Sequence, residues 1–336
     1  MNAPRVVTIG GATQDVFVIS KDVNIMRMQS FDCEDAFFAI PYGAKVDVDE
    51  MFITTGGSAT NTSITFHRFG LATSVLAKVG DDRSGGIVRE RLVEEGIDDS
   101  MIAVDPDHRT GYSAILVGYT GERSVLVHRG ATLHLTESDI DWDRMREAEL
   151  VFVGSLSGQV AELYPTIAQF CAENGIFFAS NPGSGQFCEG VEACRPFLAH
   201  VDMLFMNQDE AYQFTGVEPK RGPHDEREML ERLRAAGAMR VIITQGAKGC
   251  QAIDDDAYYS IPAAKAEVVS TLGAGDAFAA GCTAAFFKGE PFARALRFGA
   301  INAAGVVSKI GAKRGIRSWA KAADEVTEWE RDASDR

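Results

Sequence analysis

The stretch that decides the fold opens with Leu150-Val151-Phe152-Val153 and closes with Val241-Ile242-Ile243-Thr244. Two further short apolar runs lie between them, and segments of helical periodicity separate the runs. The runs lie at residues 176–179 and 203–206, and the helical segments at 160–173 and 226–236. Wholly apolar short strands separated by helices are typical of parallel strands covered on both faces. The pattern predicts a doubly wound α/β fold with a mostly parallel central sheet flanked by helices.

Two early segments depart from this alternation. Residues from about 15 to 54 contain no convincing helix, and residues from about 110 to 129 form two apparent strands, Tyr112 to Val117 and Ser124 to Val127, with a turn at 119–122. Extra antiparallel strands of this kind favour a small sheet beside the main one. We expect residues 1–336 to form one α/β domain with this sheet as a lid. The alternative is an edge extension of the main sheet.

Composition excludes several classes of function. The chain of 336 residues has 48 acidic and 33 basic side chains, a net charge of −15, which disfavours binding to a nucleic acid backbone. The six cysteines have neither C-x-x-C nor zinc spacing, which indicates reduced thiols. No leader pattern opens the sequence, and its longest apolar stretch, Ala277 to Phe287, is shorter than the ~18 residues that span a bilayer. We expect a cytoplasmic protein without a membrane or nucleic acid partner.

One glycine-rich motif precedes a helix that is apolar nearly all round. Its sequence is Ser270-Thr271-Leu272-Gly273-Ala274-Gly275-Asp276. The backbone N–H groups of Gly273, Ala274 and Gly275 at a buried helix start would form an anion site. Asp276 then fits a general base that takes the proton of a hydroxyl as its oxygen attacks phosphorus. The alternative is an acid that only complements the helix dipole.

A second glycine-rich motif, Thr55-Gly56-Gly57-Ser58-Ala59-Thr60-Asn61, opens a helix that runs to about Phe69. Gly56 and Gly57 allow a ligand to approach the backbone, and Asn61 can exchange hydrogen bonds with a polyol. The alternative is a plain turn with Ser58 as the N-cap.

Two more motifs directly follow predicted strands. In Asn207-Gln208-Asp209-Glu210, the first and last residues share a helix face and could hold the water shell of Mg²⁺, or could form a capping box. Thr244-Gln245-Gly246-Ala247-Lys248-Gly249 suits a loop over phosphates or a plain hairpin. The sequence contains no Walker A, G-x-G-x-x-G or H-E-x-x-H motif.

Together these motifs resemble the ribokinase-like PfkB family of carbohydrate and nucleoside kinases, from Val6 to about Gly315. The first family signature is matched by Gly56 to Asn61, with Gly70 and Gly80-Asp81-Asp82 after it, and the second by Ser270 to Asp276. The Asn-x-x-Glu and Thr-x-Gly-x-x-Gly elements lie between them in the family order.

The resemblance implies a role for each matched residue. Asp276 would be the catalytic base, with Gly273, Ala274 and Gly275 as the anion hole. ATP would be bound by Asn207, Thr244, Gly246 and Gly249, with Asn181 nearby and Asn302 towards the adenine, and Asn207 with Glu210 would organise Mg²⁺ through water. Asp15, Gly56, Gly57 and Asn61 would bind acceptor hydroxyls. The lid of this family often pairs with a second subunit, which implies a homodimer.

Three departures from the family pattern bear on K⁺ activation and on the kind of acceptor. Ser270 stands where cation-dependent members have Asp, so K⁺ activation is not expected. Ser58 replaces the Lys of ribokinases and phosphosugar kinases, and Gly154-Ser155-Leu156-Ser157 lacks their usual Glu, which disfavours ribose and sugar phosphates as acceptors.

The acceptor class stays open between three hypotheses. Arg129 leaves the second lid strand and would read the carboxylate of a sugar acid, as in kinases of keto-deoxy sugar acids, or form a surface ion pair. Phe37, Phe38 and Tyr42 would stack on a nucleobase or pack the lid. We place a small sugar or sugar acid first and adenosine or another nucleoside second. The third hypothesis is a catalytically idle ligand-binding member of the family.

Overall fold

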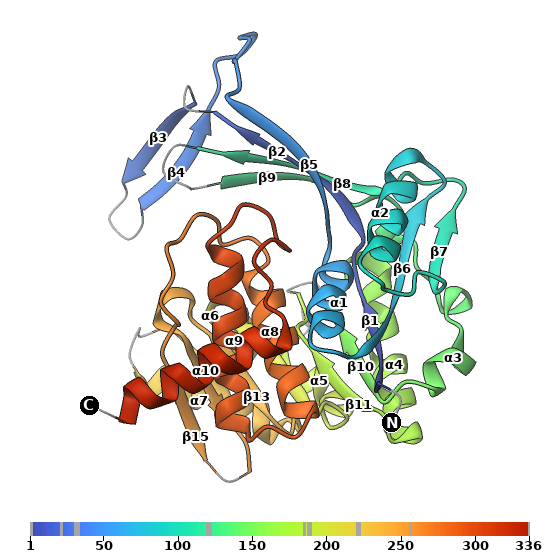
Figure 1. The fold of residues 1–336 in the computed structure, drawn as a ribbon, viewed down its shortest axis with the longest axis vertical. Coiled ribbons are helices and arrows are strands. Elements are labelled where there is room, and N and C mark those ends of the chain that lie inside the picture. Colours follow the sequence, from blue (N-terminus) through green and yellow to red (C-terminus); the bar gives the residue numbers. More distant parts are fainter. Residues whose placement is uncertain are drawn as a thin grey trace.

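The structure, a computed structural model, describes residues 3–20, 23–29, 34–118, 123–183, 186, 190–219, 223–255 and 257–334. Within them a nine-stranded sheet forms the centre of the molecule (Figure 1). In sheet order its strands are β15 (Tyr258–Ile261), β14 (Cys250–Ile253), β13 (Val241–Thr244), β12 (Met203–Asn207), β11 (Phe177–Ser180), β10 (Leu150–Val153), β1 (Arg5–Ile9), β6 (Ala72–Gly80) and β7 (Ile102–Asp105). Strands β1, β6, β7 and β10 to β13 are parallel, and β14 and β15 add an antiparallel edge. The predicted doubly wound α/β fold is confirmed.

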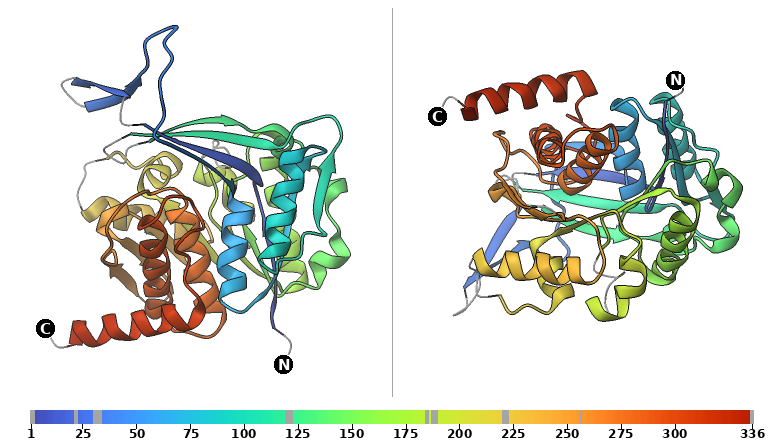
Figure 2. Two further views of the ribbon diagram at one scale, coloured as in Figure 1. Left: turned by 45° about the horizontal axis from the view of Figure 1, so that its top comes forward. Right: turned by 90° about the horizontal axis from the view of Figure 1, so that it is seen from below.

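Helices cover both faces of this sheet (Figure 2). They are α1 (Ser58–Arg68), α2 (Arg83–Glu94), α3 (Trp142–Arg146), α4 (Leu163–Asn174), α5 (Val191–Leu198), α6 (Gln208–Thr215), α7 (Pro223–Ala235), α8 (Ala274–Phe287), α9 (Phe292–Val307) and α10 (Trp319–Ser334). Because successive strand residues face opposite sides, Val151 and Val153 pack with α4, α5 and α7, whereas Leu150 and Phe152 pack with α1, α8 and α9. Each buried strand therefore needs an unbroken apolar run.

A separate four-stranded sheet, here called the lid sheet, extends beyond the main layer and over the ends of α8 and α9 (Figure 1). Its strands, in order, are β5 (Glu50–Gly56), β2 (Thr13–Ile19), β8 (Gly111–Val117) and β9 (Arg123–His128). A two-stranded ribbon lies beside it, formed by β3 (Asn24–Gln29) and β4 (Glu34–Ala39). Among the described residues no lid strand joins the nine-stranded sheet, so the edge-extension alternative is wrong. The predicted turn at 119–122 lies outside the described residues.

The aromatic residues near the ribbon differ in their surroundings. Phe38 lies so close to Gly118 that a Cβ there would be 3.3 Å from its ring, whereas Phe37 and Tyr42 are exposed. Phe38 therefore packs the lid, as one of the two alternatives expected. Pairing of the lid with a second subunit stays a prediction.

Two further features concern the cysteines and the apolar helices. Cys171, Cys194, Cys250 and Cys282 are free and buried, and Cys33 and Cys188 lie outside the described residues. Within the described part of the chain, no helix is both long enough and apolar enough to cross a membrane.

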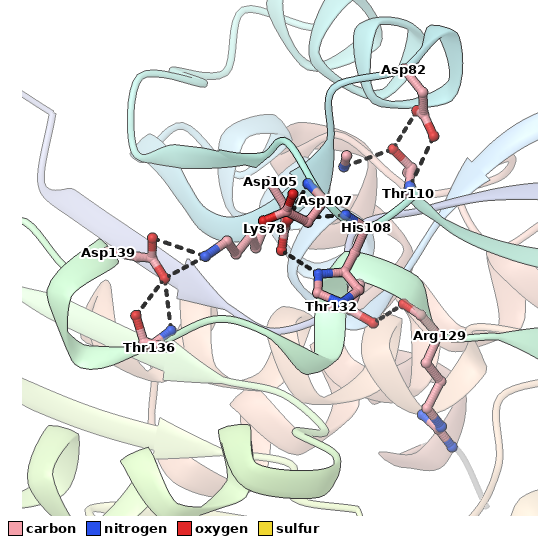
Figure 3. Close-up of polar contacts among 11 residues, drawn as sticks. Lys78, Asp82, Asp105, Asp107, His108, Thr110, Arg129, Thr132, Thr136 and Asp139 are labelled. Carbon is pink, nitrogen blue, oxygen red and sulfur yellow. Dashed lines mark hydrogen bonds and ion pairs between the residues drawn. The ribbon is translucent and has the colours of Figure 1, made fainter.

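One carboxylate, that of Asp82, lies at the junction between the lid sheet and the main body (Figure 3). Asp82 caps α2 by accepting a hydrogen bond from Gly85 N at 2.8 Å. It also accepts hydrogen bonds from Thr110 N at 3.0 Å and Thr110 Oγ1 at 2.6 Å, directly before β8. The Thr110 hydroxyl accepts a bond from Gly80 N at 2.9 Å, at the end of β6. Asp82 and Thr110 therefore tie the residue directly before lid strand β8 to a helix and a strand of the main body.

We expect Asp82→Ala to destabilise the fold by about 1–2 kcal/mol, because the helix loses its cap. Burial raises the pKa of Asp82, but the hydrogen bonds from Thr110 and Gly85 outweigh it, and the net pKa is lowered. The stabilisation is therefore present above the unfolded-state pKa of about 3.9 and is lost as pH falls through the lower folded-state value. Urea unfolding at pH 7 and at low pH measures this. The exposed neighbour Asp81 supplies the control Asp81→Ala, and equal losses in both variants would contradict the assignment.

Candidate active site

The catalytic candidate Asp276 meets Asn61 across the interface of two helices. Asn61 Nδ2, in the first turn of α1, donates a hydrogen bond to Asp276 Oδ2, in the first turn of α8, at 2.8 Å. Burial raises the pKa of Asp276 to about 6, although the Asn61 hydrogen bond and the charge of Lys313 oppose the rise. Asn61 Oδ1 is buried and has no hydrogen-bond partner among the described residues. An uncommitted acceptor thus lies beside a carboxylate that titrates near neutral pH.

Asp15 lies at the same end of α1 and is buried in the lid sheet. Burial raises its pKa, against hydrogen bonds from Ser113 and Thr13 and the charge of Lys313. A Cβ on Gly56 would lie 1.9 Å from Asp15 Oδ2, so any other residue there would displace the Asp15 carboxylate. Gly57 has a φ of 96° and a Cβ there would lie 2.2 Å from Gly11 O. The two glycines therefore let β5 and α1 approach Asp15 and the end of β1.

Gly57, and not Ser58, is the N-cap of α1. The Ser58 hydroxyl instead accepts a hydrogen bond from Gly11 N at 3.3 Å. A Cβ on Gly154 would lie 2.5 Å from that hydroxyl. The predicted N-cap at Ser58 is corrected: its side chain fills the space between the ends of β1 and β10.

The start of α8 is a glycine-rich turn, and its role as an anion site stays a prediction. Gly273 is its N-cap, with a left-handed φ of 75°. Ala274 N donates to Thr271 O at 3.3 Å, whereas Gly275 N and Asp276 N form no backbone hydrogen bond among the described residues. From the lid, Arg123 Nη1 donates a hydrogen bond to the Thr271 hydroxyl. The lid strand β9 therefore reaches the glycine-rich turn that precedes α8.

Asn207 and Glu210 form a capping box on α6. Glu210 N donates to Asn207 Oδ1 at 2.8 Å, and Asn207 N donates to Glu210 Oε2 at 2.9 Å. Burial raises the pKa of Glu210, and the charge of Glu210 in turn raises the pKa of Asp276. The capping alternative is therefore correct for Asn207, because its side-chain oxygen accepts a hydrogen bond from the helix backbone. The charge of Glu210 still affects the pKa of Asp276.

The Thr244 to Gly249 segment is the turn between the antiparallel strands β13 and β14. Gln245 N donates to Gly249 O at 2.8 Å, and Gly249 has a φ of 95° with its Cβ position 2.0 Å from Ile261 O. Gly246 has a φ of 55° and nothing within 4 Å of its Cβ position. The hairpin expected as an alternative is present, and Gly246 leaves open space above it.

Asn181 and Asn302, the two asparagines predicted to lie near ATP, differ in their surroundings. Asn181 follows β11, and its Nδ2 would lie 3.8 Å from a Cβ on Gly275. Asn302 is fully buried in α9: its Nδ2 donates to Ala277 O at 2.8 Å and its Oδ1 accepts from Arg317 N at 3.0 Å. Asn302 is therefore part of the core, which gives no support to the predicted adenine contact; that contact stays a prediction.

Arg129 lines a cavity of about 150 Å³ between the lid and the ends of β1 and β10. Its Nη1 donates to Ser157 Oγ at 2.8 Å. Lys78 also lines this cavity and is paired with Asp139 at 2.9 Å, and of the described lining residues none is acidic (Figure 3). The predicted surface ion pair of Arg129 is absent from the described residues; its partner there is a hydroxyl.

Sequence reasoning missed Lys313, whose ammonium donates to Thr55 Oγ1 at 2.6 Å and to Thr60 Oγ1 at 2.8 Å. The available signal was a lysine inside the glycine-bounded segment Gly311-Ala312-Lys313-Arg314-Gly315. It also missed Arg123, which follows the predicted lid turn.

Most of the remaining candidates gather at the carboxyl ends of β1, β10, β11, β12 and β13, where open α/β sheets bind ligands.

Comparisons with known proteins agree with this arrangement. A family model described as pfkB family carbohydrate kinase matches residues 24–319. The chain belongs to this family. The ribokinase of Haemophilus influenzae is 27% identical over 292 residues, which are 84% of this chain and 92% of that protein.

Two solved structures share the fold. A ribokinase of Arabidopsis thaliana complexed with ribose and ATP has a TM-score of 0.79 at 19% identity, covering 96% of this chain and 99% of that one. A nucleoside kinase of Burkholderia thailandensis in complex with inosine has a TM-score of 0.76 at 18% identity, covering 96% and 98%. The chain is a PfkB-type sugar or nucleoside kinase, a phosphotransferase that acts on a hydroxyl group.

Proposed function

We propose that the protein transfers the terminal phosphoryl group of ATP to a hydroxyl of a small sugar or sugar acid, with Asp276 as the general base. The observation that carries the proposal is the Asn61–Asp276 contact of 2.8 Å at the start of α8. It joins a carboxylate of raised pKa to an amide whose oxygen is uncommitted among the described residues. A hydroxyl that donates to one of these groups and accepts from the other would be oriented for attack.

The chemical step follows from these groups. Asp276 takes the proton of the acceptor hydroxyl while that oxygen forms a bond to the terminal phosphorus and the bond to the bridging oxygen of ADP breaks. Charge on the transferred group meets the N-terminal end of α8, where backbone N–H groups are already oriented. Because the pKa of Asp276 is about 6, it is mainly ionised at pH 7 and still basic enough to take a proton.

Glu210 would hold Mg²⁺ through water. Its Oε2 accepts a bond from Asn207 N, while no bond to its Oε1 is formed among the described residues. Asn207 Oδ1 is used by the helix cap, so Asn207 would act by orienting Glu210 and not as a ligand. One carboxylate fits an ion that keeps several waters and binds mainly phosphates; bound there, it would neutralise phosphate charge. Within the described ranges, no three acidic, His or Cys side chains are placed so that they could hold a metal ion together.

ATP would lie along the turn after β13 and the start of α8. Gly246 is exposed with open space above it, and Thr244 ends the strand beneath. Asn181 approaches Gly275 from β11. The open space at Gly246 and the approach of Asn181 to Gly275 support phosphate binding by Thr244, Gly246 and Gly249, with Asn181 near the reacting end.

We expect Asp276→Asn to lower kcat by about 10²- to 10⁴-fold, because the amide cannot take the proton. ATP affinity should change little. Coupled ADP-release kinetics and calorimetric ATP titration measure the two effects. The control is Asp143→Asn, which removes an exposed first-turn carboxylate from α3. Undiminished turnover in Asp276→Asn would mean that Asp276 is not the base and only complements the dipole of α8.

The acceptor is proposed as a sugar or sugar acid because the cavity under the lid carries Arg129, five hydroxyl-bearing residues and, among its described lining, no acid. A nucleoside is the second candidate, supported by the similarity to the nucleoside kinase with inosine. Phe37 and Tyr42, which would stack on a base, are exposed.

A screen of sugars, sugar acids and nucleosides by ADP release tests this choice. We expect sugar acids or sugars to be phosphorylated faster than nucleosides. For an acidic acceptor, Arg129→Gln should raise KM roughly ten-fold by removing a charged hydrogen bond, whereas the exposed control Arg91→Gln should not. Faster turnover of nucleosides would favour the second candidate. Binding of acceptors without any ADP release would favour a catalytically idle member.

We also propose that K⁺ is not required. Ser270 is buried, and its hydroxyl accepts from Leu272 N at 3.4 Å, so a neutral group stands where a carboxylate would attract the ion. We expect the same kcat/KM in KCl and in NaCl at equal ionic strength. A large increase in KCl would contradict this.

A further inference from the structure

Lys313 joins the acceptor-binding end of the site from a distant part of the chain. It lies in residues 308–318, between α9 and α10. Its ammonium donates to Thr55 Oγ1 at 2.6 Å, where lid strand β5 ends, and to Thr60 Oγ1 at 2.8 Å, one residue before Asn61. The positive charge is therefore fixed at the junction of the lid with α1.

The segment that carries Lys313 is pressed against the turn that begins α8. A Cβ on Gly273 would lie 2.5 Å from Ala312 Cβ and 2.8 Å from Ala312 Cα. Thr60 Oγ1 in turn donates to Gly56 O at 2.7 Å, so its lone pairs remain for the ammonium. Both ends of the lysine side chain are thus held by backbone packing or by hydrogen bonds, unlike those of a mobile surface lysine.

Three carboxylates act on this ammonium: Asp15 in the lid sheet, Glu95 after α2, and Asp276 in α8. Glu95 is already bound by Arg68 Nη2 through both of its oxygens at 3.0 Å. The charge of Lys313 is therefore available mainly to Asp15 and Asp276. Its two hydrogen bonds go to hydroxyl groups and not to a carboxylate, which leaves both acids able to contact an acceptor.

Burial raises the pKa of both Asp15 and Asp276, and the charge of Lys313 opposes the rise in each of them. A protonated Asp276 is no base. We propose that Lys313 is a positioning residue for the proposed reaction, whose fixed charge keeps Asp15 and Asp276 ionised together so that one binds the acceptor while the other takes its proton. This inference rests on the proposed kinase function.

The pKa shifts of Lys313 and Asp276 agree with this role. Burial lowers the pKa of Lys313 to about 7, against the charges of Asp15, Glu95 and Asp276, which raise it. Burial raises the pKa of Asp276 to about 6; the Asn61 hydrogen bond and Lys313 lower it, and Glu210 raises it. Activity should fall as pH drops through the value of Asp276 and again as pH rises through that of Lys313.

The test is the pH profile of kcat/KM in the wild type, Lys313→Met and Lys313→Arg. In Lys313→Met we expect the acid limb to move up by about 1 to 3 pH units, so that kcat/KM at pH 6 falls roughly ten-fold or more and recovers partly at higher pH. Lys313→Arg should restore the acid limb and abolish the alkaline one, because the guanidinium does not titrate in this range.

Thr55→Val is the matched control, because it removes one hydrogen bond of the ammonium and leaves its charge. It should keep the wild-type acid limb. A wild-type acid limb in Lys313→Met, or the same displaced limb in Thr55→Val, would overturn the inference and leave Lys313 a packing role. Calorimetric ATP binding by each variant shows that its fold is retained.

A second measurement needs no turnover and so separates this inference from the proposed function. NMR titration of the lysine side chains, with Lys313→Arg to assign the signal, should give an unusually low pKa for Lys313. Asp15→Asn and Asp276→Asn should each lower it further. A value near the ordinary 10.4, unmoved by either substitution, would overturn the inference even if the protein phosphorylates sugars.

Discussion

The hydrogen bond between Asn61 and Asp276 is the contact on which the arrangement of the site depends. Helix α1 begins where lid strand β5 ends, and α8 begins at the glycine-rich turn after Ser270. The 2.8 Å contact between their first turns would therefore join the proposed acceptor side of the site to the proposed phosphate side. Tight glycine positions at Gly56, Gly57 and Gly273 allow these two helix starts to meet their neighbours so closely. A Cβ there would meet Asp15, Gly11 or Ala312, respectively.

Charge is distributed unevenly in this acidic protein. The net charge is −15, yet basic side chains from two separate segments lie near the proposed site: Arg123 and Arg129 at the two ends of β9, and Lys313 between α9 and α10. Two of them are on the lid, so closure of the lid would bring positive charge over bound phosphate and acceptor. Backbone N–H groups at the start of α8 add fixed dipoles that a count of charged residues does not register. An overall negative charge is therefore compatible with anionic ligands.

The sequence predicted the parts of the fold that depend on local pattern. Strands β10 and β13 were found at their observed bounds because all of their residues except the last of β13, Thr244, are apolar and buried. The antiparallel edge strand β15 was not foreseen, since it has only four residues and Ile261 alone among them is buried. The spacing of Asn207 and Glu210 fits a metal site and a capping box equally well, and only the hydrogen bonds distinguish them. Lys313 lies 258 residues from Thr55, and no local pattern in one sequence indicates such a contact.

The most direct test of this account is the pKa of the Asp276 carboxyl group, measured by ¹³C NMR titration with Asp276→Asn to assign its signal. The account predicts a value of about 6, set mainly by burial. Removing the stabilising amide with Asn61→Ala should raise it further, because a hydrogen bond to the ionised form is lost. An ordinary value near 3.9, unaffected by Asn61→Ala, would identify Asp276 as a solvated first-turn acid and contradict its role as the base.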